Sequence, residues 1–218
     1  MPFPFLNTFP QALHRVLNTV SRPPPSVADV IFAVILATSV SDGGFGYNSA
    51  TLGIALGSYG AFMFLFTLLF YPFLCRTFGP RLLFTIAFAI FIVLWPALPA
   101  FASLTASPDV QWALVLLYVL GRAVAGGTGF SVSLLFVSNA ASAGTRGRVT
   151  GLSDTFAGLT KAVAPTVAGF VWAFSASQSF PIYPYFASVV LSAFSVIGLV
   201  ASTFASPALA APRKGEFE

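Results

Sequence analysis

The chain has 218 residues, of which 57% are hydrophobic and 7% are charged, and its mean hydropathy is +0.89. Soluble domains carry about 25% charged residues, so this composition excludes a soluble domain and indicates a helical protein that crosses a membrane several times. A membrane β-barrel is excluded because its strands would alternate in hydrophobicity, and the small net charge of +4 does not favour nucleic-acid binding.

The residues that most enzyme sites need are missing from the sequence. Cys75 is the single cysteine and His14 the single histidine, so the chain cannot form a zinc cluster, an internal disulfide or a Cys/His nucleophile pair. It also contains no HExxH, P-loop or GxGxxG motif. We therefore expect that the protein is not an enzyme and needs no metal or cofactor.

Six apolar runs lie between two polar segments. Residues 1–26 are interrupted by prolines, which predicts a cytoplasmic tail or loop remnant rather than a signal peptide, and residues 207–218 predict a second cytoplasmic tail. We expect 27–206 to form an all-α membrane bundle of six transmembrane helices. The predicted helices cover 27–46, 49–75, 82–106, 111–140, 149–175 and 185–205.

The first run is the shortest of the six. Its apolar part, 27–41, spans roughly 22 Å at 1.5 Å per residue, whereas the hydrocarbon core of a bilayer is about 30 Å thick. Extending the run to residue 46 brings in Asp42 and neighbouring glycines. The distribution of basic residues nevertheless favours counting it as a span.

Basic residues outside the runs all fall on one side if six helices are drawn. The opposite loops contain Asp42 and Asp109 and neither Lys nor Arg. Cytoplasmic loops are enriched in Lys and Arg, so this pattern predicts a multi-pass membrane protein with both termini in the cytoplasm. The basic residues on that side are Arg15, Arg22, Arg76, Arg81, Arg146, Arg148, Arg213 and Lys214.

The fifth run carries charges where a transmembrane helix is usually apolar. Asp154, Gly158, Lys161, Pro165 and Trp172 share one helical stripe, because steps of three or four residues return to the same side. Charges at such depth are expensive in lipid and usually face other helices or a watery cavity. The stripe therefore predicts a protein that handles a solute or ion inside the membrane.

Each charged residue also has a purely structural interpretation. Lys161, roughly 18 Å from the cytoplasmic helix end, could bind an anionic group or relay a proton, or it could pair with a buried acid. Arg122 in the fourth run, roughly 24 Å deep, could serve the same pathway or reach the outer interface. Asp154, roughly 8 Å deep, could carry a coupling proton or pair with Arg148.

The fifth run resembles the eleventh helix of major facilitator superfamily transporters, in particular the fungal drug:proton antiporter and zinc-induced-facilitator-like branch. That branch reads roughly G-x-x-N-G-L-x-Q, then R-x-x-G-P and a later G. Lys161 stands where the branch has Arg and keeps the charge, whereas Asp154 replaces the Gln and adds one. Thr150 and Ala164 replace the Asn and a Gly. The outright matches are Gly147, Gly151, Leu152, Pro165 and Gly169.

Two further stretches carry the same resemblance. Residues 43–53 are similar to the start of the eighth helix, and residues 71–81 are similar to the cytoplasmic turn between helices eight and nine. The resemblance implies a hinge contact at that turn, formed by Arg76, Gly79 and Arg81. It also implies a helix kink or gate at Pro165 and Gly169, since proline commonly bends a transmembrane helix.

Transporters of this family have twelve helices in two six-helix halves, with the substrate site between them. The resemblance covers about residues 27–206 and implies the C-terminal half, a partial chain or truncated gene product. It implies transport of an unknown small solute, with coupling to protons as one option. Self-association or a separate N-terminal half would supply the other wall of the cavity. The alternative is a non-transporting membrane protein or an inactive remnant of a transporter gene.

Overall fold

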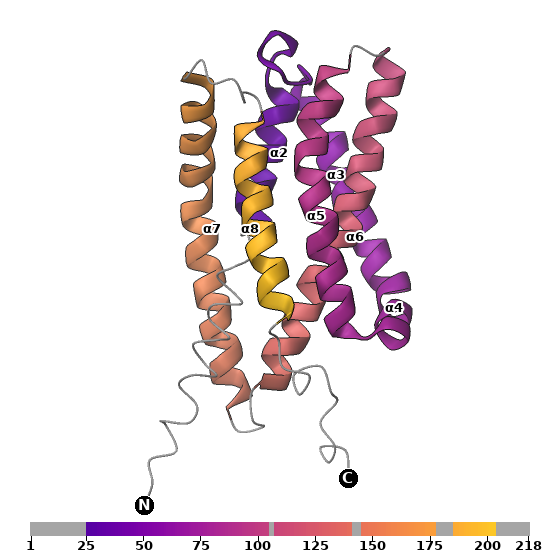
Figure 1. The fold of residues 1–218 in the computed structure, drawn as a ribbon, viewed down its shortest axis with the longest axis vertical. Coiled ribbons are helices and arrows are strands. Elements are labelled where there is room, and N and C mark those ends of the chain that lie inside the picture. Colours follow the sequence, from indigo (N-terminus) through magenta and orange to yellow (C-terminus); the bar gives the residue numbers. More distant parts are fainter. Residues whose placement is uncertain (1–24, 105–106, 141–144, 178–184, 204–218) are drawn as a thin grey trace, which may run out of the picture.

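The computed structural model describes residues 25–104, 107–140, 145–177 and 185–203, and every regular element in these ranges is a helix. The prediction of an all-α protein is thus confirmed for this part of the chain. The helices run side by side along the long axis of the molecule (Figure 1). In chain order they are α2 (Pro25–Ala37), η1 (Val40–Asp42), α3 (Ser49–Leu65), η2 (Phe66–Phe70), α4 (Tyr71–Phe78), α5 (Pro80–Ser103), α6 (Pro108–Ala140), α7 (Arg146–Ser177) and α8 (Phe186–Thr203).

Five helices in the described ranges are long and apolar enough to cross a membrane, which supports a multi-pass integral membrane protein. They correspond to the second to sixth predicted runs. The first of the five combines α3, η2 and α4 into one continuous helix. The five stretches are Ser49–Phe78, Pro80–Ser103, Pro108–Asn139, Gly147–Ser175 and Phe186–Thr203.

The first predicted span is shorter than expected. Helix α2 has 13 residues and ends at Ala37 instead of continuing to residue 46. The chain then turns through η1 and Gly43, which adopts a left-handed conformation with φ of 79°. Backbone amides of the following loop fold back onto the helix end, where Tyr47 donates to the Leu36 carbonyl at 2.9 Å and Gly46 to the Thr38 carbonyl at 2.7 Å. These bonds satisfy carbonyls that a helix end leaves free.

Local sequence explains where the next helices begin and end. Asn48 caps α3, because its side-chain oxygen accepts a hydrogen bond from the Thr51 amide at 2.9 Å. The turn from α4 to α5 consists of Gly79, whose φ of 77° favours glycine, followed by Pro80 in the first turn of α5. The apolar pattern of the second run does not indicate the π-helical turn η2 inside this span.

Helices α5 and α8 pack closely because small and hydroxyl side chains line their contact. Gly198 lies directly against the ring of Phe88, which would overlap a Cβ at that position. The indole nitrogen of Trp95 donates to the Ser195 hydroxyl at 2.9 Å. At the end of the contact, the guanidinium of Arg81 donates to the last helical carbonyl, that of Thr203, at 2.6 Å. A cation at a helix C-terminus is favoured by the helix dipole.

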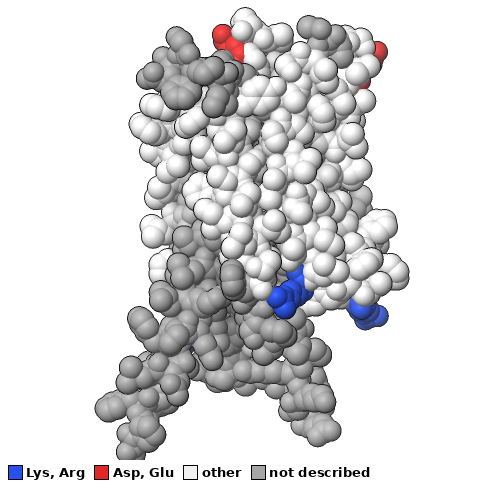
Figure 2. Space-filling model, viewed as in Figure 1, with Lys and Arg blue, Asp and Glu red and all other residues white. Residues whose placement is uncertain are grey.

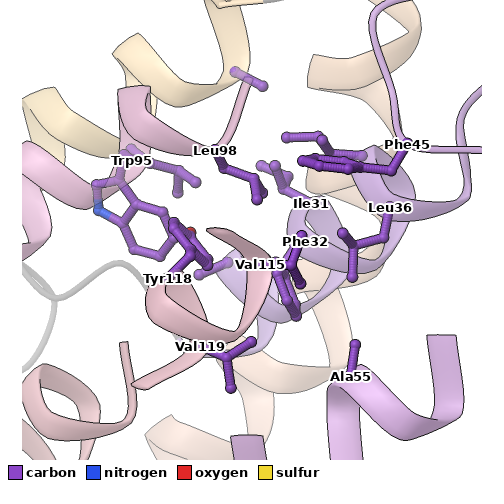
Figure 3. Packing of buried hydrophobic residues seen from close by; sticks show 14 of the residues in the cluster. Ile31, Phe32, Leu36, Phe45, Ala55, Trp95, Leu98, Val115, Tyr118 and Val119 are labelled. Carbon is purple, nitrogen blue, oxygen red and sulfur yellow. The ribbon is translucent and has the colours of Figure 1, made fainter. Parts of the chain in front are cut away.

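The main hydrophobic core lies where α2, α5 and α6 meet. Figure 3 shows Phe32 and Ile31 of α2 pointing toward Val115 of α6 and Leu98 of α5. Helix α7 takes much less part in such packing, since 11% of its apolar stretch is buried inside the chain, against 44% for α6. It stands at one edge of the bundle (Figure 1), so most of its surface is open.

On one face of the bundle the charged side chains lie at the two ends (Figure 2). On the face drawn in Figure 2, acidic groups lie at the upper end and basic groups at the lower end, with uncharged residues between them. The upper end holds the loop with Asp42 and the start of α6 with Asp109, and the lower end holds the turn flanked by Arg76 and Arg81. The face between the two ends is the surface that a bilayer would cover.

Candidate functional site: a buried ion pair between α2 and α6

The centre of the bundle contains a buried arginine. Arg122 lies near the middle of α6, and its side chain is 3% exposed. Its Nη2 donates a hydrogen bond to Oδ1 of Asp29 on α2, and the two groups form an ion pair. A buried charge is tolerated when it is paired and hydrogen-bonded, so α2 and α6 are joined by this contact.

Aromatic rings surround the guanidinium. Its central carbon lies 4.7 Å from the ring centre of Phe32, 4.6 Å from that of Tyr59 and 5.9 Å from that of Trp95. These distances fall within the range of cation–π attraction, which strengthens when the cation is removed from water. Nη1 of Arg122 is buried and has no hydrogen-bond partner among the described residues. The rings of Phe32, Tyr59 and Trp95 therefore form an aromatic cage that holds the guanidinium, while its Nη1 donors have no described partner.

The carboxylate of Asp29 is more exposed than the guanidinium of Arg122, and it also interacts electrostatically with Lys161. The Asp29 side chain is 43% exposed. Helix α7 packs against α2, and the positive charge of Lys161 on α7 makes a small favourable electrostatic contribution at Asp29. Lys161 is at the centre of the apolar stretch Gly147–Ser175, roughly 21 Å from each end at 1.5 Å per residue. Asp29 of α2, Arg122 of α6 and Lys161 of α7 thus place one acidic and two basic side chains near the middle of the bundle.

The predicted polar stripe of α7 does not face the interior of the bundle in the structure. Lys161, Asp154, Pro165 and Gly169 are all exposed within the chain. The buried face of α7 instead carries Ala164, Ala168 and Ser175. Small residues allow α7 to approach α2 on this face, while the longer polar side chains remain on the open side.

Asp154 and the turn residues lie away from the ion pair. Asp154 forms no ion pair with any side chain that the structure describes, including Arg148, so that predicted pair is not present. Its pathway role stays a prediction. Gly79 and Arg81 border a shallow cavity of about 320 Å³ at the basic end, whereas Arg76 is exposed beside it. This cavity is on the surface of the α4–α5 turn and does not reach Arg122.

The sequence analysis named Arg122 and Lys161 as candidate site residues but did not single out Asp29 or the rings of Phe32, Tyr59 and Trp95 around Arg122. A signal for Asp29 was present, because a carboxylate inside an apolar run needs a partner as much as a buried base does. The ring of Tyr59 carried no such signal, since tyrosine is common in membrane helices and its position beside Arg122 depends on how α3 meets α6.

Comparisons with family models, curated proteins and solved structures found no match to this chain.

Proposed function

We propose that the chain belongs to a secondary transporter and corresponds to the C-terminal six-helix half of a major facilitator fold, moving a small solute across a membrane. The observation that carries this proposal is the buried Asp29–Arg122 pair, with Lys161 acting on it from a third helix. Ionisable groups inside a membrane are costly and commonly mark a substrate or ion pathway. A bundle that only anchors a protein in the bilayer has no need of three such groups at one height.

In this proposal α2 is the first of six membrane helices. It is too short to span alone, but it is joined to the bundle through its contact with α7 and the Arg122 pair. The acidic end, with Asp42 and Asp109, would then face away from the cytoplasm. The basic end would be cytoplasmic, because Lys and Arg are enriched on that side of membrane proteins. An even number of helices returns both termini to this side.

The open faces of α3 and α7 favour a second unit against them. A Cβ added at Gly53, Gly57 or Gly60 of α3 would meet nothing within 4 Å, and the same holds at Gly158 of α7. Two copies of this chain in one membrane would be related by an axis along the membrane normal, so equivalent residues would lie at equal depth. Contact through α7 would then bring two Lys161 side chains together. We therefore propose a different six-helix unit as the second wall.

The transport proposal is tested in membrane vesicles from the cells in which the chain naturally occurs and from the same cells after its gene is deleted, so that a separate six-helix unit is present in both. Uptake of a panel of drugs and organic anions is measured with and without a pH gradient. We expect uptake of at least one solute to require the chain and to be lost in Arg122→Gln. The matched control Arg148→Gln removes an exposed cation near the start of α7 and should transport normally. Robust uptake by a purified monomer would contradict the half-transporter assignment.

A non-transporting membrane protein is the second candidate, and one observation favours it. Two cavities of the described part, one at the α4–α5 turn and one among mostly apolar side chains of α2, α7 and α8, are not lined by Arg122. In that case the ion pair only holds α2 in place. Identical uptake by vesicles with and without the chain, for every solute tested, would support this candidate.

A further inference from the structure

The three charged groups at the centre of the bundle do not balance. Arg122 and Lys161 contribute two positive charges, and Asp29 contributes one negative charge. Asp154 is seven positions from Lys161 on the same helix, which is too far for a direct pair on a helix surface. The described part of the site therefore carries one excess positive charge at mid-height. An uncompensated charge at that depth is expensive in a bilayer.

Lys161 is the group with unused binding capacity that a ligand can reach. Its ammonium offers three donors. Asp29 already bonds to Arg122, and no described side chain forms an ion pair or hydrogen bond with Lys161. The lysine is exposed, whereas Arg122 is enclosed by its rings. The unpartnered Nη1 of Arg122 adds to the local positive potential but is too buried to be approached from the open side.

The surroundings of Lys161 leave room for a ligand with an apolar body. Gly158 and Pro165 lie about one turn away on either side of the same face, and a Cβ at Gly158 would meet nothing within 4 Å. Neighbouring positions of α7 are mostly Ala, Val, Gly and Leu. A hydrated inorganic ion would gain nothing from this lining. A small amphiphilic anion would place its charge on the lysine and its body against the apolar face.

We propose that Lys161 is the binding residue for a monocarboxylate with an apolar body. Arg122 engages the carboxylate of Asp29 and thereby leaves Lys161 free for the ligand, and binding of a monoanion brings the net charge of the site to zero. A cation would instead raise the excess charge, and a dianion would reverse it. This proposal rests on the proposed function, because a transporter would use a binding site at this depth. Binding itself can be measured without transport.

The test uses the purified full chain in nanodiscs of zwitterionic lipid, with benzoate as the probe and benzamide as its neutral control. Calorimetric titration should show benzoate binding and no benzamide binding. Lys161→Gln should weaken benzoate binding by roughly tenfold to a hundredfold, which is typical of losing a hydrogen bond between charged groups. Asp29→Asn should strengthen it, because a repelling carboxylate is removed. Arg148→Gln, which removes an exposed cation far along α7 from Lys161, should leave it unchanged.

A measurement on the unmodified chain guards against variants that fail to fold. The chain has two lysines, Lys161 and Lys214, so amine acylation followed by peptide mapping provides an internal reference. Benzoate should protect Lys161 relative to Lys214, and benzamide should protect neither. Equal binding of benzamide, absence of Lys161 protection, or loss of binding in folded Asp29→Asn would overturn the proposal. Benzoate binding without uptake of any carboxylate would refute the proposed function while leaving this site established.

Discussion

At the scale of single residues, the Asp29–Arg122 pair is asymmetric. Arg122 is almost fully enclosed, whereas the Asp29 side chain is 43% exposed. Removing Asp29 leaves a buried cation without its counter-charge. Removing Arg122 instead leaves a carboxylate that is already partly exposed at the surface of the chain. Loss of one partner of a buried pair costs more than loss of both, because the remaining charge stays desolvated.

This asymmetry predicts different stabilities for two single variants. Asp29→Asn should lower the free energy of unfolding by about 3 kcal/mol, a typical cost of leaving a buried charge unpaired. Arg122→Gln should cost less, and the double variant Asp29→Asn/Arg122→Gln should be more stable than Asp29→Asn alone. Denaturant unfolding in detergent micelles measures all three. Additive losses in the double variant would show that the two side chains do not stabilise each other.

At the scale of helices, the described bundle contains a tightly packed contact between α5 and α8 and two loosely packed stretches, Ser49–Phe78 and Gly147–Ser175. Glycine at position 198 brings α8 against the ring of Phe88 on α5, and hydroxyl groups complete that contact. Gly53, by comparison, lies on a face of α3 with no neighbouring atom within 4 Å of an added Cβ. The same residue type therefore has opposite roles in two helices.

A pair of alanine substitutions tests this difference. Gly198→Ala should destabilise the protein by about 1–3 kcal/mol, because the new methyl group forces α5 and α8 apart. Gly53→Ala should be neutral or stabilising by up to about 1 kcal/mol, because alanine has the higher helix propensity and nothing opposes it. Thermal unfolding of both variants gives the comparison. A loss at Gly53 equal to that at Gly198 would mean that α3 also contacts another element there.

At the scale of the whole molecule, five of the six predicted spans are helices long and apolar enough to cross a membrane, because a long and mostly apolar run is typical of a membrane helix. The end of α2 at Ala37 depended on a loop that folds back onto its carbonyls, which apolar length does not reveal. The stripe of α7 was identified correctly as a helical face, but periodicity does not tell which face packs. The partner of Arg122 could have been inferred only by treating Asp29 as a charge in need of compensation.

The separation of acidic and basic ends predicts the orientation of the chain in its membrane. In a Cys75→Ser background, Ser41→Cys would place a thiol at the acidic end and Thr77→Cys at the basic end, both at exposed positions. A membrane-impermeant maleimide applied to intact cells should label Ser41→Cys only, because the basic end is expected in the cytoplasm. Thr77→Cys should react only after permeabilisation. The reverse pattern would invert the proposed topology.

The brevity of α2 also bears on how the protein is made. Its 13 residues include an aspartate, and a carboxylate costs about 3 kcal/mol when a nascent helix enters the bilayer. This segment leaves the ribosome well before Arg122 has been synthesised. We therefore expect stable insertion of α2 to follow the synthesis of α6, which supplies the opposite charge, and of α7, which covers its side.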